Sequence, residues 1–173
     1  MNNSKITTVA QLREALSRSP GQSGYSAVVD RVDIPLEALE PYLHWKKEDH
    51  SRVSLYDSEA IEAVLTCWEP GQGSAIHNYD FKQGWVVVIQ GELYLELYHI
   101  HNKKVSEVSE LSLHDRDVFY LNDGMGFHRF SNSSPRRTIA LFLYAGKVDK
   151  WSVYDEDSGV FKTEIPNYDN AHS

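Results

Sequence analysis

The spacing of apolar residues changes near residue 52. Before that point apolar side chains recur every three to four residues. After it they alternate with polar ones or form short runs between turn residues. Such runs predict β-strands, because successive side chains of a strand point to opposite faces. The predicted strands cover residues 53–56, 61–68, 74–79, 84–90, 92–100, 104–110, 117–121, 126–131, 138–145, 152–155 and 160–163.

The connections between these strands favour an antiparallel all-β architecture. Gly, Asn, Pro or Asp stands where the chain must reverse, for example in the segments 69–73, 101–104 and 122–124. The strands do not alternate with helices, as a parallel α/β sheet requires. The pattern therefore predicts a mostly β protein, either a sandwich or a jelly-roll barrel.

The first fifty residues predict two helical segments. Thr8 can cap a helix that carries Val9, Leu12 and Leu16 on one face, and a second segment spans 36–47, where Pro41 must weaken or kink it. We expect both to pack on the outside of the barrel. The predicted organisation is a helical segment over 1–50, a barrel over 51–165 and a flexible tail over 166–173.

Composition restricts the class of partner. The 173 residues carry a net charge of −8, with 25 acidic and 17 basic residues, and contain no block of like charges. Neither nucleic acid nor an anionic membrane is expected as a partner.

The apolar runs are too short to cross a bilayer, and no export signal is recognised at the N-terminus, so the cytoplasm is expected. The single cysteine, Cys67, agrees with a reducing compartment and is expected to be buried. The oligomeric state is left open.

Two histidines stand out as candidate metal ligands. His77 lies within a predicted strand, and Tyr79, two residues on, should point to the same face. His128 lies in a later strand. Imidazoles from two neighbouring strands would converge inside a barrel, where they suit iron, copper, nickel or zinc. A second pair, His99 and His101, ends a strand beside a turn and is expected to point outward.

Beyond these residues, the chain resembles a known family, the cysteine dioxygenase-like thiol dioxygenases of the cupin superfamily. The spacing of Gly71, His77 and Gly91 matches the first cupin motif, and His128 with Asn132 matches the end of the second. Longer stretches carry the family resemblance over roughly 51–157. They are Ser51-Arg52-Val53-Ser54-Leu55-Tyr56, Cys67-Trp68-Glu69-Pro70-Gly71-Gln72, Leu121-Asn122-Asp123-Gly124-Met125-Gly126-Phe127-His128-Arg129 and Leu141-Phe142-Leu143-Tyr144-Ala145-Gly146.

The resemblance implies a cupin jelly-roll barrel and a ferrous iron, Fe(II), held by three histidines. Those positions are His77, Tyr79 and His128 here. The resemblance places the arginine that pairs with a substrate carboxylate at Arg52, and guanidinium suits a carboxylate because it can bind both oxygens. It places an active-site tyrosine at Tyr144. The implied reactants are O2 and a small thiol carboxylate, cysteine or 3-mercaptopropionate, which becomes a sulfinic acid.

The chain departs from the family pattern at the third ligand and beside Tyr144. Tyr79 replaces a histidine, and the Ser-x-His-x-Tyr relay of the family reads Ala140-Leu141-Phe142-Leu143-Tyr144, without its hydrogen-bonding groups. Tyr79 could ligate ferric iron as a phenolate. It could instead stay neutral beside a metal held by two histidines and water or Asp80, or the pocket could hold no metal or another divalent transition metal.

Three functions follow from these alternatives. The first is an iron-dependent thiol dioxygenase with His77, Tyr79 and His128 at the metal and Arg52 and Tyr144 at the substrate. The second is a divergent cupin that binds a small carboxylate without catalysis. The third is an oxygenase with an altered metal and a non-thiol substrate. The remaining histidines, His44, His50, His114 and His172, are expected at the surface.

Overall fold

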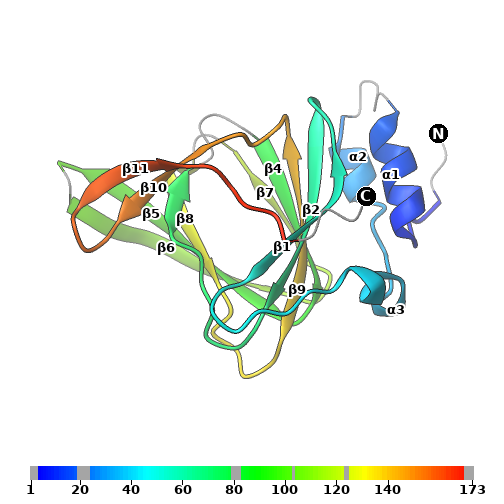
Figure 1. Ribbon diagram of the computed structural model, residues 1–173, viewed down its shortest axis with the longest axis horizontal. Helices are drawn as coiled ribbons and strands as arrows, with labels where there is room; N and C mark the ends of the chain where they lie inside the picture. The colour runs from blue at the N-terminus through cyan, green and yellow to red at the C-terminus, as the bar shows by residue number, and fades with distance from the viewer. Residues whose placement is uncertain (1–3, 19–23, 79–82, 103, 123–124, 170–173) are drawn as a thin grey trace.

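Two antiparallel sheets form the body of the protein in this computed structural model, which describes residues 4–18, 24–78, 83–102, 104–122 and 125–169 (Figure 1). The five-stranded sheet has the order β1-β2-β9-β4-β7, and the six-stranded sheet has the order β11-β10-β3-β8-β5-β6. The strands are β1 (Ser51–Asp57), β2 (Ile61–Trp68), β3 (Ile76–Asn78), β4 (Gln83–Gln90), β5 (Glu92–His101), β6 (Lys104–His114), β7 (Val118–Leu121), β8 (Phe127–Ser131), β9 (Thr138–Ala145), β10 (Trp151–Asp155) and β11 (Val160–Glu164). This arrangement confirms the predicted cupin jelly roll.

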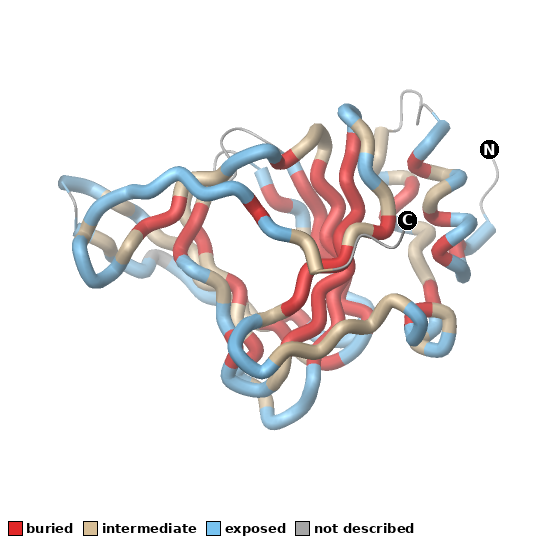
Figure 2. The backbone as a smooth tube through the Cα atoms, viewed as in Figure 1, coloured by how far each residue is buried: buried red, intermediate tan, exposed pale blue. Residues whose placement is uncertain are grey.

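The central strands of the five-stranded sheet are buried on both faces. In β2 and β9, odd-numbered residues such as Leu65 and Leu141 pack toward the N-terminal helices, whereas even-numbered ones such as Val64 and Phe142 face the other sheet. Strands buried on both sides read as continuous apolar runs, which explains why the sequence alone located them. Figure 2 shows this sheet as the most continuously buried part of the backbone.

Short helices cover the outer face of that sheet, as predicted. They are α1 (Val9–Ser17), α2 (Ser26–Val29), α3 (Leu36–Leu39) and the 3-10 turn η2 (Glu40–Tyr42). Thr8 caps α1 by accepting a bond from the Gln11 N–H at 3.1 Å. The predicted helix over 36–47 was wrong beyond Tyr42: α3 ends at Leu39, and the chain tightens into η2 around Pro41, whose ring cannot continue an α-helix.

The C-terminal segment is held in place as far as Asp169, against the expected loose tail. The red segment in Figure 1 runs from β11 back to β1 of the other sheet. There the Asp169 carboxylate accepts bonds from Lys46 Nζ at 2.9 Å and from the Arg52 N–H at 2.9 Å. No local pattern predicts this anchorage, because it depends on residues more than a hundred positions away. None of the helices in the described residues is long and apolar enough to cross a membrane.

Candidate functional site

His77 and His128 are brought together by the pairing of β3 with β8. The two residues stand opposite each other in the antiparallel register, and their ring centroids are 4.5 Å apart. Both side chains face the space between the sheets and are almost fully buried, at 4% and 3% exposure. The strand alternation inferred from the sequence therefore does place two imidazoles in one interior site.

Hydrogen bonds orient both imidazole rings. The Nδ1 of His77 lies 2.8 Å from the carbonyl oxygen of Ala75, and the Nδ1 of His128 lies 3.4 Å from that of Gly126. A carbonyl only accepts, so Nδ1 carries the proton and the Nε2 lone pair of the neutral ring is the ligating one. Burial lowers the pKa of His77 well below its usual value and that of His128 to about 4. Both rings are therefore neutral near pH 7, the form that binds metals.

The described residues supply two of the three expected ligands. Tyr79 and Asp80 lie outside the described residues, so the third position is not placed. Within the part of the chain that the structure describes, no group of three His, Cys, Asp or Glu side chains could hold a metal ion. Two neutral imidazoles with inward Nε2 atoms fit a divalent transition metal as a partial donor set, which Tyr79, water or a substrate would have to complete.

Arg52 lies on the interior face of β1 and is only 8% exposed. Its guanidinium carbon is 4.9 Å from the ring centre of Trp151, and the same indole lies 5.0 Å from the ring of His77. Trp151 therefore connects the candidate cation to the candidate metal ligands. The family resemblance pointed to Arg52 as a carboxylate-binding residue, and that role stays a prediction.

Tyr144 is fully interior on β9, and it packs against an aromatic side chain. It is 1% exposed, and its ring lies 6.0 Å from that of Phe142, which meets Phe130 edge to face at 5.1 Å. Ala140 lies in the same buried cluster. Gly84 stands opposite Tyr144 in the sheet, and a Cβ there would be 3.3 Å from the tyrosine ring. The two relay positions thus hold packing groups beside Tyr144.

A small internal cavity joins these residues. Its volume is about 20 Å³, room for about one water. A wider hollow of about 420 Å³ adjoins it and shares four lining residues with it. The cavity is lined by His50, Arg52, Thr66, Trp68, Ser74, His77, Phe130, Phe142, Tyr144 and Trp151.

His50 was wrongly expected at the surface. Its ring stacks on Trp68 with centroids 3.9 Å apart and an interplanar angle of 3°, and its Nδ1 is 2.7 Å from an Asp49 carboxylate oxygen. It lines both the cavity and the hollow. Its position two residues before Arg52 was the available signal, since strand alternation puts the two on one side. By contrast, His99 and His101 are exposed, as predicted.

Comparisons with known proteins agree with the fold. The family model of cysteine dioxygenase type I matches residues 36–157. The chain is 31% identical over 149 residues to cysteine dioxygenase type 1 of Rattus norvegicus, covering 79% of this chain and 74% of that protein, and the Homo sapiens protein gives the same figures.

Two solved structures share the fold alone. One is an uncharacterized conserved protein with a double-stranded β-helix domain from Klebsiella pneumoniae, with a TM-score of 0.52 and 23% identity over 68% of this chain and 95% of that chain. The other is a cupin superfamily protein from Desulfitobacterium hafniense, with a TM-score of 0.50 and 14% identity over 62% of this chain and 86% of that chain.

Proposed function

The chain belongs to the cysteine dioxygenase type I family, and on that premise we propose that it is an iron-dependent thiol dioxygenase acting on a small thiol carboxylate. One observation carries the proposal. The ring of His77, which faces that of His128, and the buried cation Arg52 both lie against the indole of Trp151. His77, Arg52 and Trp151 line the same cavity. A ligand with a thiol at one end and a carboxylate at the other matches these two ends.

The proposed reaction inserts both atoms of O2 into the substrate. The thiol sulfur forms two S–O bonds while the O–O bond breaks, so sulfur loses four electrons and O2 gains them. The thiol R–SH becomes the sulfinic acid R–SO2H, which ionises in water. No other reductant is needed.

Different residues of the chain would bind the two ends of the substrate. Arg52 would bind the carboxylate through paired hydrogen bonds, and its low exposure strengthens them because water is excluded. The Nε2 atoms of His77 and His128, with Tyr79, would hold ferrous iron. When bound there, iron would acidify the thiol and activate O2. Tyr144, inside the same cavity, would direct its hydroxyl toward the reacting atoms.

The test is oxygen consumption by purified protein loaded with ferrous iron. With 3-mercaptopropionate or cysteine, we expect O2 uptake matched one to one by sulfinate, measured with an oxygen electrode and mass spectrometry. His77→Ala should abolish both. His101→Ala is the matched control, because it removes an exposed histidine at the end of β5. Absence of uptake with every small thiol would refute the proposal.

A second candidate function is favoured by the apolar relay. Phe142 packs against Phe130 and Tyr144, and Ala140 lies in the same buried cluster, so the two positions of the family relay hold apolar side chains. A cupin that binds a small carboxylate at Arg52 without turnover would need no such support. In that case the protein would bind 3-mercaptopropionate and consume no O2, and Tyr79→His would create activity.

A further inference from the structure

The C-terminal segment contributes to the carboxylate end of the site. We propose that Tyr168 is a positioning residue, which holds the Arg52 guanidinium toward the cavity and thereby sets the affinity for the substrate's carboxylate. The inference rests on the proposed role of Arg52 in binding a carboxylate. Tyr168 lies beyond residue 157, where the match to the family model ends.

The first support is the environment of the Arg52 side chain. Its guanidinium carbon lies 4.9 Å from the ring centre of Trp151 and 5.6 Å from that of Tyr168. Both rings come from the part of the chain that follows β9, far from Arg52 in the sequence. A long arginine side chain loses much rotamer freedom when two aromatic faces hold it, and cation–π attraction to each ring strengthens when water is excluded.

The second support is the anchor of Tyr168 itself. Its hydroxyl donates to the Glu62 carboxylate and lies 3.1 Å from each oxygen. Glu62 is 2% exposed and also accepts a bond from the Val148 N–H at 3.3 Å. Burial and the charge of Glu62 raise the pKa of Tyr168, while the nearby Arg52 opposes them. The phenol therefore stays protonated and keeps donating.

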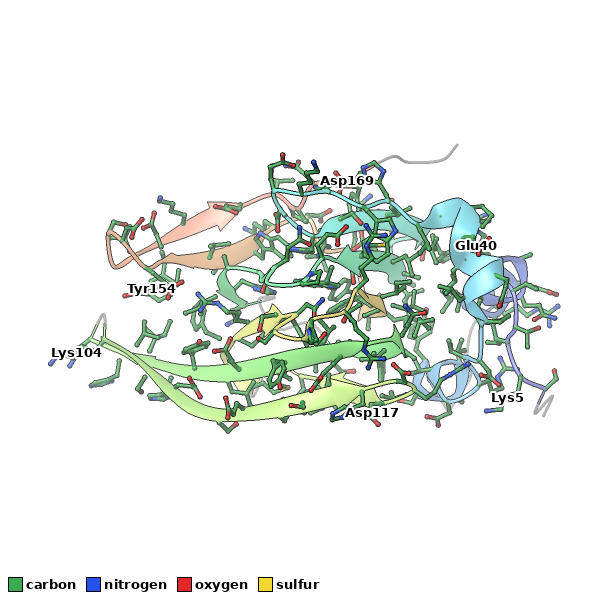
Figure 3. The ribbon with its side chains drawn as sticks, turned by 90° about the horizontal axis from the view of Figure 1, so that it is seen from below. Lys5, Glu40, Lys104, Asp117, Tyr154 and Asp169 are labelled. Carbon is green, nitrogen blue, oxygen red and sulfur yellow. The ribbon has the colours of Figure 1, made fainter. Side chains whose placement is uncertain are left out.

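The third support is the backbone connection next to Tyr168. The Asp169 N–H donates to the Arg52 carbonyl at 2.7 Å, and the Asp169 carboxylate accepts from the Arg52 N–H at 2.9 Å. Lys46 pairs with the same carboxylate. Figure 3 labels Asp169 and shows it far from Tyr154 on the β10–β11 hairpin. The segment is thus hydrogen-bonded to the backbone of Arg52, and the ring of Tyr168 lies against the side chain of the same residue.

A purely structural role would make a different prediction. If Tyr168 only supplied a hydrogen bond to the buried Glu62, its replacement would lower stability and leave carboxylate affinity unchanged. A positioning role moves the affinity for a carboxylate ligand specifically. A measurement of ligand affinity therefore distinguishes the positioning role from the purely structural role. This measurement requires neither a bound metal nor turnover.

The experiment is calorimetric titration of the metal-free, full-length protein with 3-mercaptopropionate. Tyr168→Leu keeps apolar bulk but removes the ring and the hydroxyl, and we expect about a tenfold rise in Kd. Tyr168→Phe restores the ring without the bond to Glu62, and a rise of about threefold is expected. Tyr120→Leu is the matched control, because it removes an exposed tyrosine of β7 outside the cavity lining and should leave Kd unchanged.

Arg52→Gln separates failure of this inference from failure of the proposed function. If Arg52→Gln weakens binding and Tyr168→Leu does not, the inference is wrong and the role of Arg52 stands. If Arg52→Gln binds as well as the parent, the carboxylate role of Arg52 fails, and the inference fails with it. Should Tyr168→Leu not fold, an unchanged Kd for Tyr168→Phe overturns the inference.

Discussion

Acidification should destabilise the metal-free protein through its buried histidine pair. The perturbation is a fall in pH from 7 to 4, with the free energy of unfolding measured at each pH by urea titration. Burial lowers the pKa of His128 from 6.5 to about 4, so the unfolded chain binds a proton that the folded chain rejects. Folding stability therefore falls as pH falls below 6.5, and the loss is complete below pH 4.

The size of the loss follows from the difference between the two pKa values. For His128 alone, linkage gives a loss of about 2 kcal/mol between pH 7 and pH 5, and about 3 kcal/mol by pH 4. His77 adds to this in the same direction, since its pKa is also lowered by burial and by the neighbouring His128. A loss of this size is a large fraction of the stability of a typical domain.

The assay compares how stability changes with pH in three proteins. His128→Asn cannot titrate, so its unfolding free energy should fall by about 2 kcal/mol less than that of the parent between pH 7 and pH 5. His101→Gln removes an exposed histidine and should follow the parent. Parallel curves for the parent and His128→Asn would refute the reasoning, because they would mean that His128 is hydrated in the folded state.

Three further predictions follow from the packing and the site. Gly91→Ala should lower the unfolding free energy by more than about 2 kcal/mol, since φ is +93° and the new Cβ would lie 2.5 Å from a side-chain oxygen. Gly71→Ala, at φ +84° with open space around the new Cβ, should lower it by only about 1–2 kcal/mol. Equal melting temperatures for the two variants would contradict this. Phe142→His should raise O2 uptake by about 10- to 100-fold by placing a polar side chain beside Tyr144, and unchanged turnover would show that the apolar residue at position 142 does not limit activity. His77→Ala should lose iron on gel filtration, as measured by metal analysis, whereas retention equal to the parent would remove His77 from the ligand set.

The sequence was sufficient wherever local pattern determines structure. The bounds of β2 and β9 were predicted to the residue, because their apolar runs are buried on both faces and flanked by turn residues. Motif spacing and alternation also identified His77 and His128 as interior residues. Tyr79 stays a prediction, since it lies outside the described residues.

One miss came from contacts between distant parts of the chain. Nothing local distinguishes Tyr168 from any tyrosine near a C-terminus, and its role depends on Glu62, more than a hundred residues earlier. For His50 a local signal was available in its position two residues before Arg52, whereas its stacking on Trp68 depends on how the strands pack. The second helix ended sooner than predicted for a local reason, because the ring of Pro41 cannot continue an α-helix.

The two-sided burial of β2, β4 and β9 gives each strand two independent sets of positions. Odd-numbered residues hold the helical layer, and even-numbered residues such as Phe142 and Tyr144 form the wall of the cavity. A substitution on one side leaves the packing of the other side in place. The barrel can therefore exchange residues at its reactive surface while the helix-covered face maintains the fold. A library of variants could randomise the even-numbered positions of β2, β4 and β9 and keep the odd-numbered positions unchanged as a scaffold.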